Sequence, residues 1–215
     1  MTRPELLTFD IFGTVLDWST GLSEAVRTAT GRAVCFDDFD RIVDVQGADE
    51  QAPPFKSYRA ITAASLVSVL GMDAARADAI GAEAGRWPLF ADSAEGLRGL
   101  MKVARCAAMS NSDRAHGEQV QQSLGFRLSA WICAEDVGCY KPSQEFWRKV
   151  SERLEIPFGP AWWHVSAYAD YDLDVAKRLG LTSIYVPRRH ARPPKPEDDV
   201  RTVRDLLELA SLIGA

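Results

Sequence analysis

The feature that most constrains the fold is an alternation of short apolar segments with helical segments, broken once by a long stretch that is helical throughout. The apolar run at 6–9 ends at Asp10 and has the pattern of a buried strand. From about residue 18 to residue 87 the pattern is helical, and glycine and proline residues mark its breaks. Within this stretch, helices are expected near 19–31, 36–47, 56–70 and 73–86.

Strand and helix alternate again after Pro88. Strands are expected at 106–110, 130–133, 162–166 and 182–186, and helices at 94–104, 114–124, 143–154, 172–179 and 199–213. Short apolar strands separated by helices predict a parallel sheet with helices on both faces. The fold class is therefore α/β, a doubly wound, Rossmann-like parallel sheet formed by 1–16 and 89–215, with an all-helical insert at 17–88. The segment 187–198, rich in Pro, Arg and Lys, is expected to be a surface connection.

Composition and charge exclude several classes of function. The net charge of −5 argues against a nucleic-acid partner, because binding a phosphate backbone requires a basic face. No apolar run approaches the roughly 20 residues needed to cross a bilayer, so no membrane partner is expected. The four cysteines show no CxxC spacing, which favours reduced thiols in a cytoplasmic protein over a zinc site. A small anionic substrate is compatible with this charge, because a few buried cations can bind it.

Polar side chains follow four of the expected strands. They are Asp10, then Ser110 and Asn111, then Lys141, and finally Ser166 with the nearby Asp172. A single polar residue at such a position often only caps the helix that follows. Because the carboxyl ends of parallel strands meet at one edge of a sheet, the whole set predicts a site at that edge. A carboxylate, hydroxyl groups, an ammonium group and a second carboxylate would meet there.

The stretches that carry these residues resemble the haloacid dehalogenase superfamily, and most closely its 2-haloacid dehalogenase (type II) branch. They read FDIFGTVLDW at 9–18, SNSD at 110–113, AEDVGCYKP at 134–142 and DLDVAKRLG at 172–180. The resemblance spans the whole α/β core, and the helical insert matches the family's cap domain in position and length. It implies a hydrolase that works through an aspartate nucleophile.

The resemblance also implies individual roles. Asp10 would be the nucleophile, and Thr14 would steady its carboxylate. Lys141 would keep Asp10 ionised and, with Ser110, hold the carboxylate of the substrate, while Asp172 would position the hydrolytic water. The remaining positions implied to contact the substrate are Ile11, Phe12, Asn111 (beside the leaving group), Ser166 and Tyr168. An aspartate that is desolvated beside a fixed cation can attack an activated carbon, so the roles agree with the chemistry.

The choice between a dehalogenase and a phosphatase depends on position 12. A phosphatase of this superfamily carries a second aspartate there as general acid, whereas this chain carries Phe12, which cannot donate a proton. The first acidic residue of the family's metal motif falls at Ala167, which leaves Asp172 alone. A halide leaves as a stable anion and needs neither group, so no metal and no cofactor are expected. Phe12 would form an apolar wall near the leaving group, although simple core packing explains it equally well.

The helical insert contributes further candidates. Counting from Asp10, Arg41 lies where dehalogenases carry the arginine that receives the departing halide, but the neighbouring carboxylates could instead hold it in a surface ion pair. Apolar walls could come from Trp18, Phe55, Tyr58 and Trp147. The turn after the fourth strand departs from the family pattern, because Tyr168 replaces an asparagine, and this change could reshape the pocket.

The leading hypothesis is a metal-independent hydrolase, of the (S)-2-haloacid dehalogenase kind, that cleaves the carbon–halogen bond of a short 2-haloalkanoic acid. An ester of Asp10 would form and be hydrolysed to a 2-hydroxy acid. The alternatives are a related hydrolase with another leaving group at C2, such as a strained ring amine, a magnesium-dependent phosphatase, or a catalytically silent relative. The partner would be a small carboxylate, and the Trp and Phe content would allow a homodimer.

Overall fold

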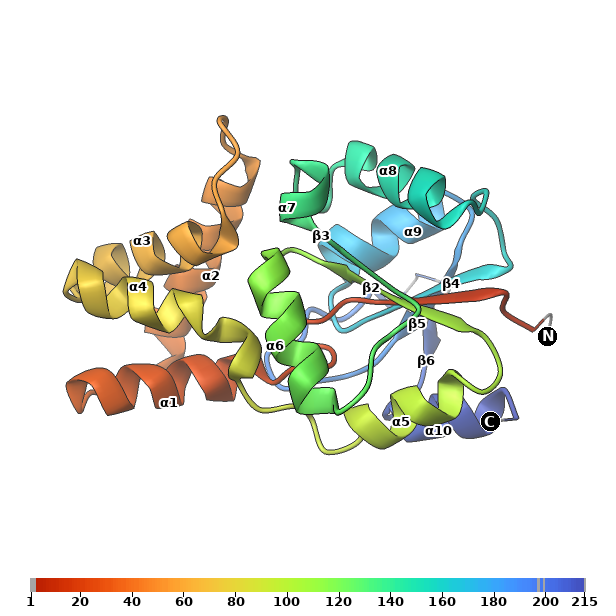
Figure 1. Cartoon of the computed structure of the whole chain (residues 1–215), viewed down its shortest axis with the longest axis horizontal. Coiled ribbons are helices and arrows are strands. Elements are labelled where there is room, and N and C mark those ends of the chain that lie inside the picture. The colour runs from red at the N-terminus through yellow and green to blue at the C-terminus, as the bar shows by residue number, and fades with distance from the viewer. Residues whose placement is uncertain (1–2, 197, 199, 215) are drawn as a thin grey trace.

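The central element of the fold is a six-stranded parallel sheet, seen together with its helices in the computed structural model of Figure 1. The structure describes residues 3–196, 198 and 200–214. The strand order is β3-β2-β1-β4-β5-β6, which is that of a doubly wound fold. The strands are β1 (Leu6–Phe9), β2 (Arg105–Ser110), β3 (Ala130–Cys133), β4 (Trp162–Ser166), β5 (Thr182–Tyr185) and β6 (Arg201–Thr202). The predicted fold class is confirmed.

Strand β1 lies in the middle of the sheet, and every one of its side chains is buried. It pairs with β2 on one side and with β4 on the other, so that Phe9 lies between Ala108 and Val165. The strand order reverses between β1 and β4, and in such sheets ligands bind beyond the strand ends at this point. Asp10 follows β1 directly and therefore stands at the reversal point.

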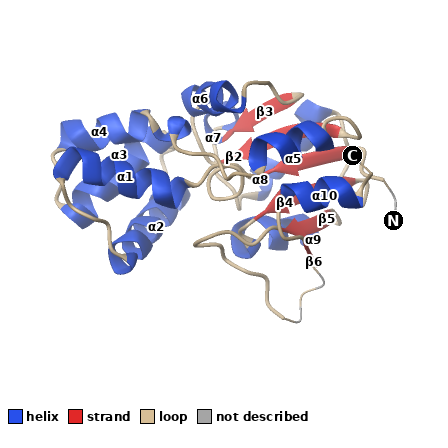
Figure 2. Cartoon of the chain, turned by 90° about the horizontal axis from the view of Figure 1, so that it is seen from below, coloured by secondary structure: helices blue, strands red, loops and turns tan. Residues whose placement is uncertain are grey.

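Helices cover both faces of the sheet. Figure 1 shows α8 and α9 above the sheet and α5, α6 and α10 below it, and the view from below in Figure 2 shows α5 and α10 lying across the sheet. The helices of this core are α5 (Ser93–Leu100), α6 (Arg114–Leu124), α7 (Ala134–Val137), α8 (Gln144–Leu154), α9 (Asp174–Arg178) and α10 (Leu206–Leu212), with a π-helical turn η2 (Ala169–Leu173) before α9.

The insert forms a separate helical layer at one end of the sheet (Figures 1 and 2). It consists of α1 (Trp18–Thr30), α2 (Phe36–Gln51), α3 (Tyr58–Leu70), α4 (Ala74–Ala82) and the short 3₁₀ helix η1 (Ala84–Arg86). The chain enters and leaves this layer through two adjacent linkers, because Leu16 forms an antiparallel bridge with Leu89. The Asp17 N–H also donates to the Pro88 carbonyl at 2.7 Å. We call this layer the cap.

Two segments near the C-terminus differ from the prediction. The single helix expected at 199–213 is wrong: Arg201 and Thr202 pair with β5 as β6, and the helix begins only at Leu206. Residue 199 lies outside the described residues. A stretch that reads as amphipathic helix in isolation becomes strand here because the edge of β5 offers backbone partners.

The segment 187–198 is also more than a surface connection. The side chain of Arg188 is only 7% exposed and binds both carboxylate oxygens of Asp92 at 2.7 Å. Its Nε also donates to the Thr14 carbonyl at 3.0 Å, so this loop is fixed to the turn that follows Asp10. A buried bidentate pair holds the segment against the core. Among the described residues, no helix combines the length and the apolar character needed to cross a bilayer.

Candidate active site

The turn after β1 fixes the carboxylate of Asp10. The Asp10 N–H donates to the Val165 carbonyl at 3.0 Å, and its side chain is almost fully buried. Gly13 has a φ of +92°, and a Cβ at this position would collide with the ring of Tyr168, so a glycine is required. The chain then turns back, and the Thr14 hydroxyl donates to Asp10 Oδ2 at 2.7 Å. One carboxylate oxygen is thereby held by the same loop that carries the aspartate.

The ammonium group of Lys141 holds the other oxygen of Asp10. Its Nζ lies 3.0 Å from Asp10 Oδ1 and 2.9 Å from Asp172 Oδ1, and the Lys141 side chain is 0% exposed. Asn111 fixes the backbone here, because Lys141 N–H donates to its Oδ1 at 2.8 Å and its Nδ2 donates to the Lys141 carbonyl at 3.1 Å. Burial alone would lower the pKa of Lys141, but the two carboxylates outweigh burial and raise it. Lys141 therefore stays charged.

The two carboxylates beside Lys141 differ in their surroundings. Burial raises the pKa of Asp10 above its usual value, although Lys141 opposes the shift. Burial acts in the same direction on Asp172, but there Lys141 and His164 prevail and lower the pKa. Asp172 also accepts a hydrogen bond from the Ser166 hydroxyl at 2.8 Å. Asp172 is thus the fixed counter-charge of Lys141, and Asp10 is the less stabilised, more reactive carboxylate.

A cavity of about 200 Å³ opens between the core and the cap. The core contributes Asp10, Phe12, Asn111, Tyr168, Tyr171 and Arg192 to its wall, and the cap contributes Trp18, Val43, Asp44, Gln46, Gly47, Glu50 and Tyr58. This volume is below the range of roughly 300–1,000 Å³ that is usual for drug-sized ligands, so the cavity suits a molecule of few heavy atoms.

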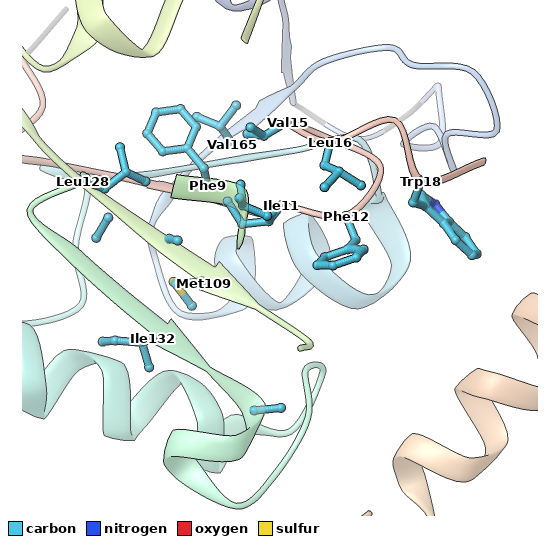
Figure 3. Close-up of a cluster of buried hydrophobic side chains, with 14 of the residues drawn as sticks. Phe9, Ile11, Phe12, Val15, Leu16, Trp18, Met109, Leu128, Ile132 and Val165 are labelled. Carbon is cyan, nitrogen blue, oxygen red and sulfur yellow. The ribbon is translucent and has the colours of Figure 1, made fainter. Parts of the chain in front are cut away.

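Aromatic rings shield the carboxylate of Asp10 from solvent. Phe12 meets Tyr58 edge to face at 5.2 Å, and the Trp18 indole N–H donates to the Tyr168 hydroxyl at 2.8 Å. Tyr168 in turn stacks on Tyr171 at 5.1 Å. Figure 3 shows Phe12 and Trp18 at the end of the buried cluster farthest from Phe9. An apolar wall of this kind lowers the local dielectric constant and strengthens every charge interaction inside the cavity.

The core itself positions the cap wall. Asp113, at the start of α6, accepts hydrogen bonds from the backbone N–H groups of Tyr58 at 2.8 Å and Arg59 at 2.9 Å. A carboxylate at the amino end of a helix stabilises it, so the last residue of the SNSD stretch also anchors α3 and the ring of Tyr58. Of the other aromatic candidates, Trp18 lines the cavity, whereas Phe55 stacks on Tyr140 and Trp147 packs on His164 in the core.

The structure brings most of the predicted site residues together. Asp10, Phe12, Asn111 and Tyr168 line the cavity, and Thr14 and Lys141 bind Asp10 directly. Asp172 binds the same Lys141 ammonium group and accepts a hydrogen bond from Ser166. Two others are displaced from the wall. Ile11 is 0% exposed within the hydrophobic core (Figure 3). Ser110 is equally buried, and its hydroxyl donates to Ser112 at 2.8 Å. Neither Ile11 nor Ser110 lines the cavity.

Arg41 is the clearest departure from the prediction. Its side chain is 63% exposed, lies 3.6 Å from Asp38, and does not line the cavity. The surface ion pair with a carboxylate on the same helix is therefore the arrangement found. Among the described residues, the cation that lines the cavity is Arg192, whose Nη1 donates to Asp170 Oδ2 at 2.8 Å. Its backbone pairs with the turn after β4: its N–H donates to the Ala167 carbonyl at 3.0 Å, and Ala169 N–H donates to its carbonyl at 2.8 Å.

Sequence reasoning missed Glu50, Asp44, Tyr171 and Arg192. Glu50 Oε2 accepts a hydrogen bond from Asn111 Nδ2 at 2.9 Å, and burial raises the pKa of Glu50 to about 8. A spacing signal does exist, because Val43, Gly47 and Glu50 fall on one helix face. That signal cannot show which face of α2 turns toward the core, so it was not sufficient to single out Glu50.

The carboxylates that could help hold a metal ion are Asp10 and Asp172. Both are paired with the Lys141 ammonium, and Ala167 contributes no oxygen from its side chain. Within the described part of the chain, no group of three or more His, Cys, Asp or Glu side chains is arranged to hold a metal. A divalent cation would have to share these two carboxylates with Lys141, so the donor set fits magnesium poorly.

A buried aspartate at the end of the first strand, a lysine after the third and an inserted helical cap define a class of hydrolases with an aspartate nucleophile. The family model of haloacid dehalogenase-like hydrolases matches residues 4–163, and the chain belongs to this family. No curated protein sequence matched the chain.

Solved structures of similar fold include several dehalogenases. The L-2-haloacid dehalogenase PA0810 has 23% identity and a TM-score of 0.82, over 98% of this chain and 99% of that one. The Xanthobacter autotrophicus L-2-haloacid dehalogenase with chloropropionic acid covalently bound has 17% identity and a TM-score of 0.83, over 99% of both chains. The HAD-hydrolase YfnB of Bacillus subtilis, bound to magnesium, has 16% identity and a TM-score of 0.79, over 100% of both. At these identities the likeness establishes the fold.

Proposed function

We propose that the protein is a metal-independent hydrolase that replaces the substituent on C2 of a short 2-substituted carboxylic acid by a hydroxyl group, through an ester of Asp10. A 2-haloalkanoic acid, which would lose halide, is the simplest such substrate. The observation that carries the proposal is the carboxylate of Asp10, which is desolvated, fixed by Thr14 and Lys141, and placed on the wall of a small cavity beside Phe12. Phe12 offers no proton, so this wall suits displacement at carbon.

In the first step a carboxylate oxygen of Asp10 would attack C2 in line with the leaving group. Burial removes the water that would otherwise stabilise the carboxylate, and the fixed contacts align it. Alignment of this kind can contribute on the order of 7 kcal/mol. The carboxylate of the substrate would bind Arg192, because Lys141 and Ser110 lie beneath the wall and Arg192 lies on it.

In the second step water would attack the carboxyl carbon of the Asp10 ester. Esterification removes the negative charge of Asp10, which leaves Asp172 as the carboxylate beside Lys141. Asp172 would then take up one proton of the attacking water, while the Lys141 ammonium would stabilise the oxygen that becomes negative. The bond between the Asp10 carboxyl carbon and the oxygen on C2 would break, and that oxygen would take the second proton of the water, while Asp172 would release its proton to solvent. The products are a 2-hydroxy acid with inverted configuration at C2 and the free Asp10 carboxylate.

Chloride release from each enantiomer of 2-chloropropionate, with EDTA present, tests this proposal. We expect release from one enantiomer and a loss of roughly 10³-fold or more in Asp10→Asn, because the nucleophile is removed. Asp174→Asn is the matched control, since it makes the same change at a carboxylate of α9 outside the cluster. Chloride release from neither enantiomer would contradict the 2-haloacid substrate, and magnesium-dependent release of phosphate from 4-nitrophenyl phosphate would favour a phosphatase instead.

A further inference from the structure

Glu50 is an acidic group in the cavity that halide displacement does not use. It comes from α2 of the cap, lines the same cavity as Asp10, and is held by Asn111 Nδ2 at 2.9 Å. Asn111 is fixed in turn by its two hydrogen bonds to the backbone of Lys141. A carboxyl group of the cap therefore lines the cavity in direct contact with Asn111, which in turn binds the backbone of Lys141.

Glu50 is suited to hold a proton at neutral pH. Burial raises its pKa to about 8, and the charges that act on it are the carboxylates of Asp10 and Asp172 and the ammonium of Lys141. A general acid works best when its pKa lies near the working pH. A halide, in contrast, leaves without a proton.

The cavity also has a polarity along its core-to-cap direction. The core wall carries the Asp10 carboxylate and the guanidinium of Arg192, which also pairs with Asp170 at 2.8 Å. The described residues of the cap wall include two acids, Asp44 and Glu50, and no cation. Arg41, the cap arginine expected to receive a departing anion, lies outside the cavity and pairs with Asp38. A leaving group that moved toward the cap would meet acids, and this arrangement favours a basic atom over a halide ion.

We propose that Glu50 is the proton donor to the leaving group, and that the natural substrates are short carboxylic acids whose C2 carries the nitrogen of a small strained ring. This inference rests on the proposed function, because it assumes attack by Asp10 on C2. An amine leaves saturated carbon poorly unless it is protonated and the bond is strained. The Glu50 proton meets the first requirement and the ring meets the second.

The reaction balances as follows. A carboxylate oxygen of Asp10 bonds to C2 as the C2–N bond breaks, and the electron pair of that bond stays on nitrogen. The Glu50 proton moves to the nitrogen, so the ring opens to a free amine and Glu50 becomes a carboxylate. Water then cleaves the Asp10 ester, and Asp172 takes up the proton released in that step. Asp172 passes this proton to solvent, and Glu50 regains one proton from solvent. The net change is the addition of one water molecule to the ring substrate.

The test compares two three-carbon probes, aziridine-2-carboxylic acid and 2-chloropropionic acid, each as separate enantiomers and with an enzyme-free blank. We expect the wild-type protein to open one aziridine enantiomer to 3-amino-2-hydroxypropanoic acid, the product of attack at C2. In Glu50→Gln, kcat/KM for ring opening should fall roughly 100-fold more than kcat/KM for chloride release, since general acid catalysis contributes about 10²–10⁴-fold. Asp44→Asn removes one acid from the same wall and should change both reactions by similar factors.

The other outcomes separate the two proposals. Chloride release by the wild-type protein without ring opening would overturn the role of Glu50 and leave the proposed function intact. Failure on both probes would overturn the proposed function itself. Equal losses of both activities in Glu50→Gln would show that Glu50 only shapes the cavity, which contradicts proton donation. Faster opening of oxirane-2-carboxylic acid than of the aziridine would contradict the choice of nitrogen.

Discussion

The core and the cap hold their cavity side chains in opposite ways. On the core side, Asp10, Lys141 and Asp172 have side chains at most 3% exposed, and the Lys141 Nζ lies within 3.0 Å of both carboxylates. On the cap side, Glu50 is half-buried and is held by a residue of the core, and Arg41 faces solvent. Asp10, Lys141 and Asp172 bind partners within the core, so their positions depend little on the cap. The position of Glu50 in the cavity depends on how the cap packs against the core.

This difference separates reactivity from selectivity. The network around Lys141 can support an attacking carboxylate whatever the leaving group is. In the proposed reaction the cap residues would meet the part of the substrate that departs, so exchanging a cation for an acid there would change the preferred substrate without disturbing Asp10. Substitutions in a buried polar network destabilise the protein strongly, because each polar group left unpaired costs free energy. Substitutions on the solvent-facing side of a cap helix are tolerated much better.

The largest effect is expected for Lys141→Met. Removing the ammonium leaves Asp10 and Asp172 buried without their cation, which should destabilise the protein by about 3–5 kcal/mol at pH 7. Without Lys141, burial holds both folded-state pKa values above the unfolded ones, so the loss should grow as the pH rises from 5 to 7. Urea unfolding measures it, with the exposed Lys102→Met as control. A loss below about 1 kcal/mol would mean that Lys141 does not stabilise the two buried carboxylates.

A smaller effect is expected for Arg192→Gln. Among the described residues, Arg192 is the cation that lines the cavity, and it also pairs with Asp170. Its loss should weaken binding of 2-hydroxypropanoic acid about tenfold, or about 1.4 kcal/mol. Isothermal titration calorimetry measures this without requiring turnover, and Arg189→Gln changes an exposed neighbour in the same loop. If both variants bind equally well, the carboxylate must be held elsewhere on the wall.

Glu50→Gln should change how stability depends on pH. The pKa of Glu50 is raised by burial from 4.5 to about 8, so the folded state binds this proton more tightly than the unfolded state. The wild-type protein therefore loses stability through this group as the pH rises from 4.5 to 8, and Glu50→Gln does not. The melting temperature of the variant should gain roughly 2–4 °C on the wild type across this window, for a change of about 1 kcal/mol. If the melting temperatures of the two proteins change with pH in parallel, Glu50 is solvated in the folded protein and its pKa is not raised.

The smallest effect is expected for Arg41→Gln. An exposed ion pair at 3.6 Å contributes little, so stability and binding of 2-hydroxypropanoic acid should both change by less than about 0.5 kcal/mol. The same calorimetry used for Arg192→Gln measures the binding. A loss as large as that of Arg192→Gln would show that the cap closes further and brings Arg41 to the ligand, which would remove the contrast between the two walls.

Much of the core could be predicted because its signals are local. The strands at 130–133 and 162–166 and the helix at 114–124 follow directly from apolar runs and from turn residues. The meeting of Asp10, Lys141 and Asp172 follows from parallel topology, since strand ends in one sheet share an edge. The prediction of a helix at 199–213 was wrong because Arg201 and Thr202 pair with the edge of β5.

The cap could not be predicted to the same depth. A helix pattern gives the positions on one face but not the direction in which that face points. The rotation of α2 about its axis decides whether Arg41 or Glu50 lines the cavity. Arg192 was hidden for a related reason, because its loop is placed by backbone pairing with the turn after β4. The sequence by itself determined the fold class and the meeting of Asp10 with Lys141, since these depend on local pattern and strand order. Only the tertiary structure decided the charge of the wall that faces the leaving group, because that depends on how two separately folded layers pack together.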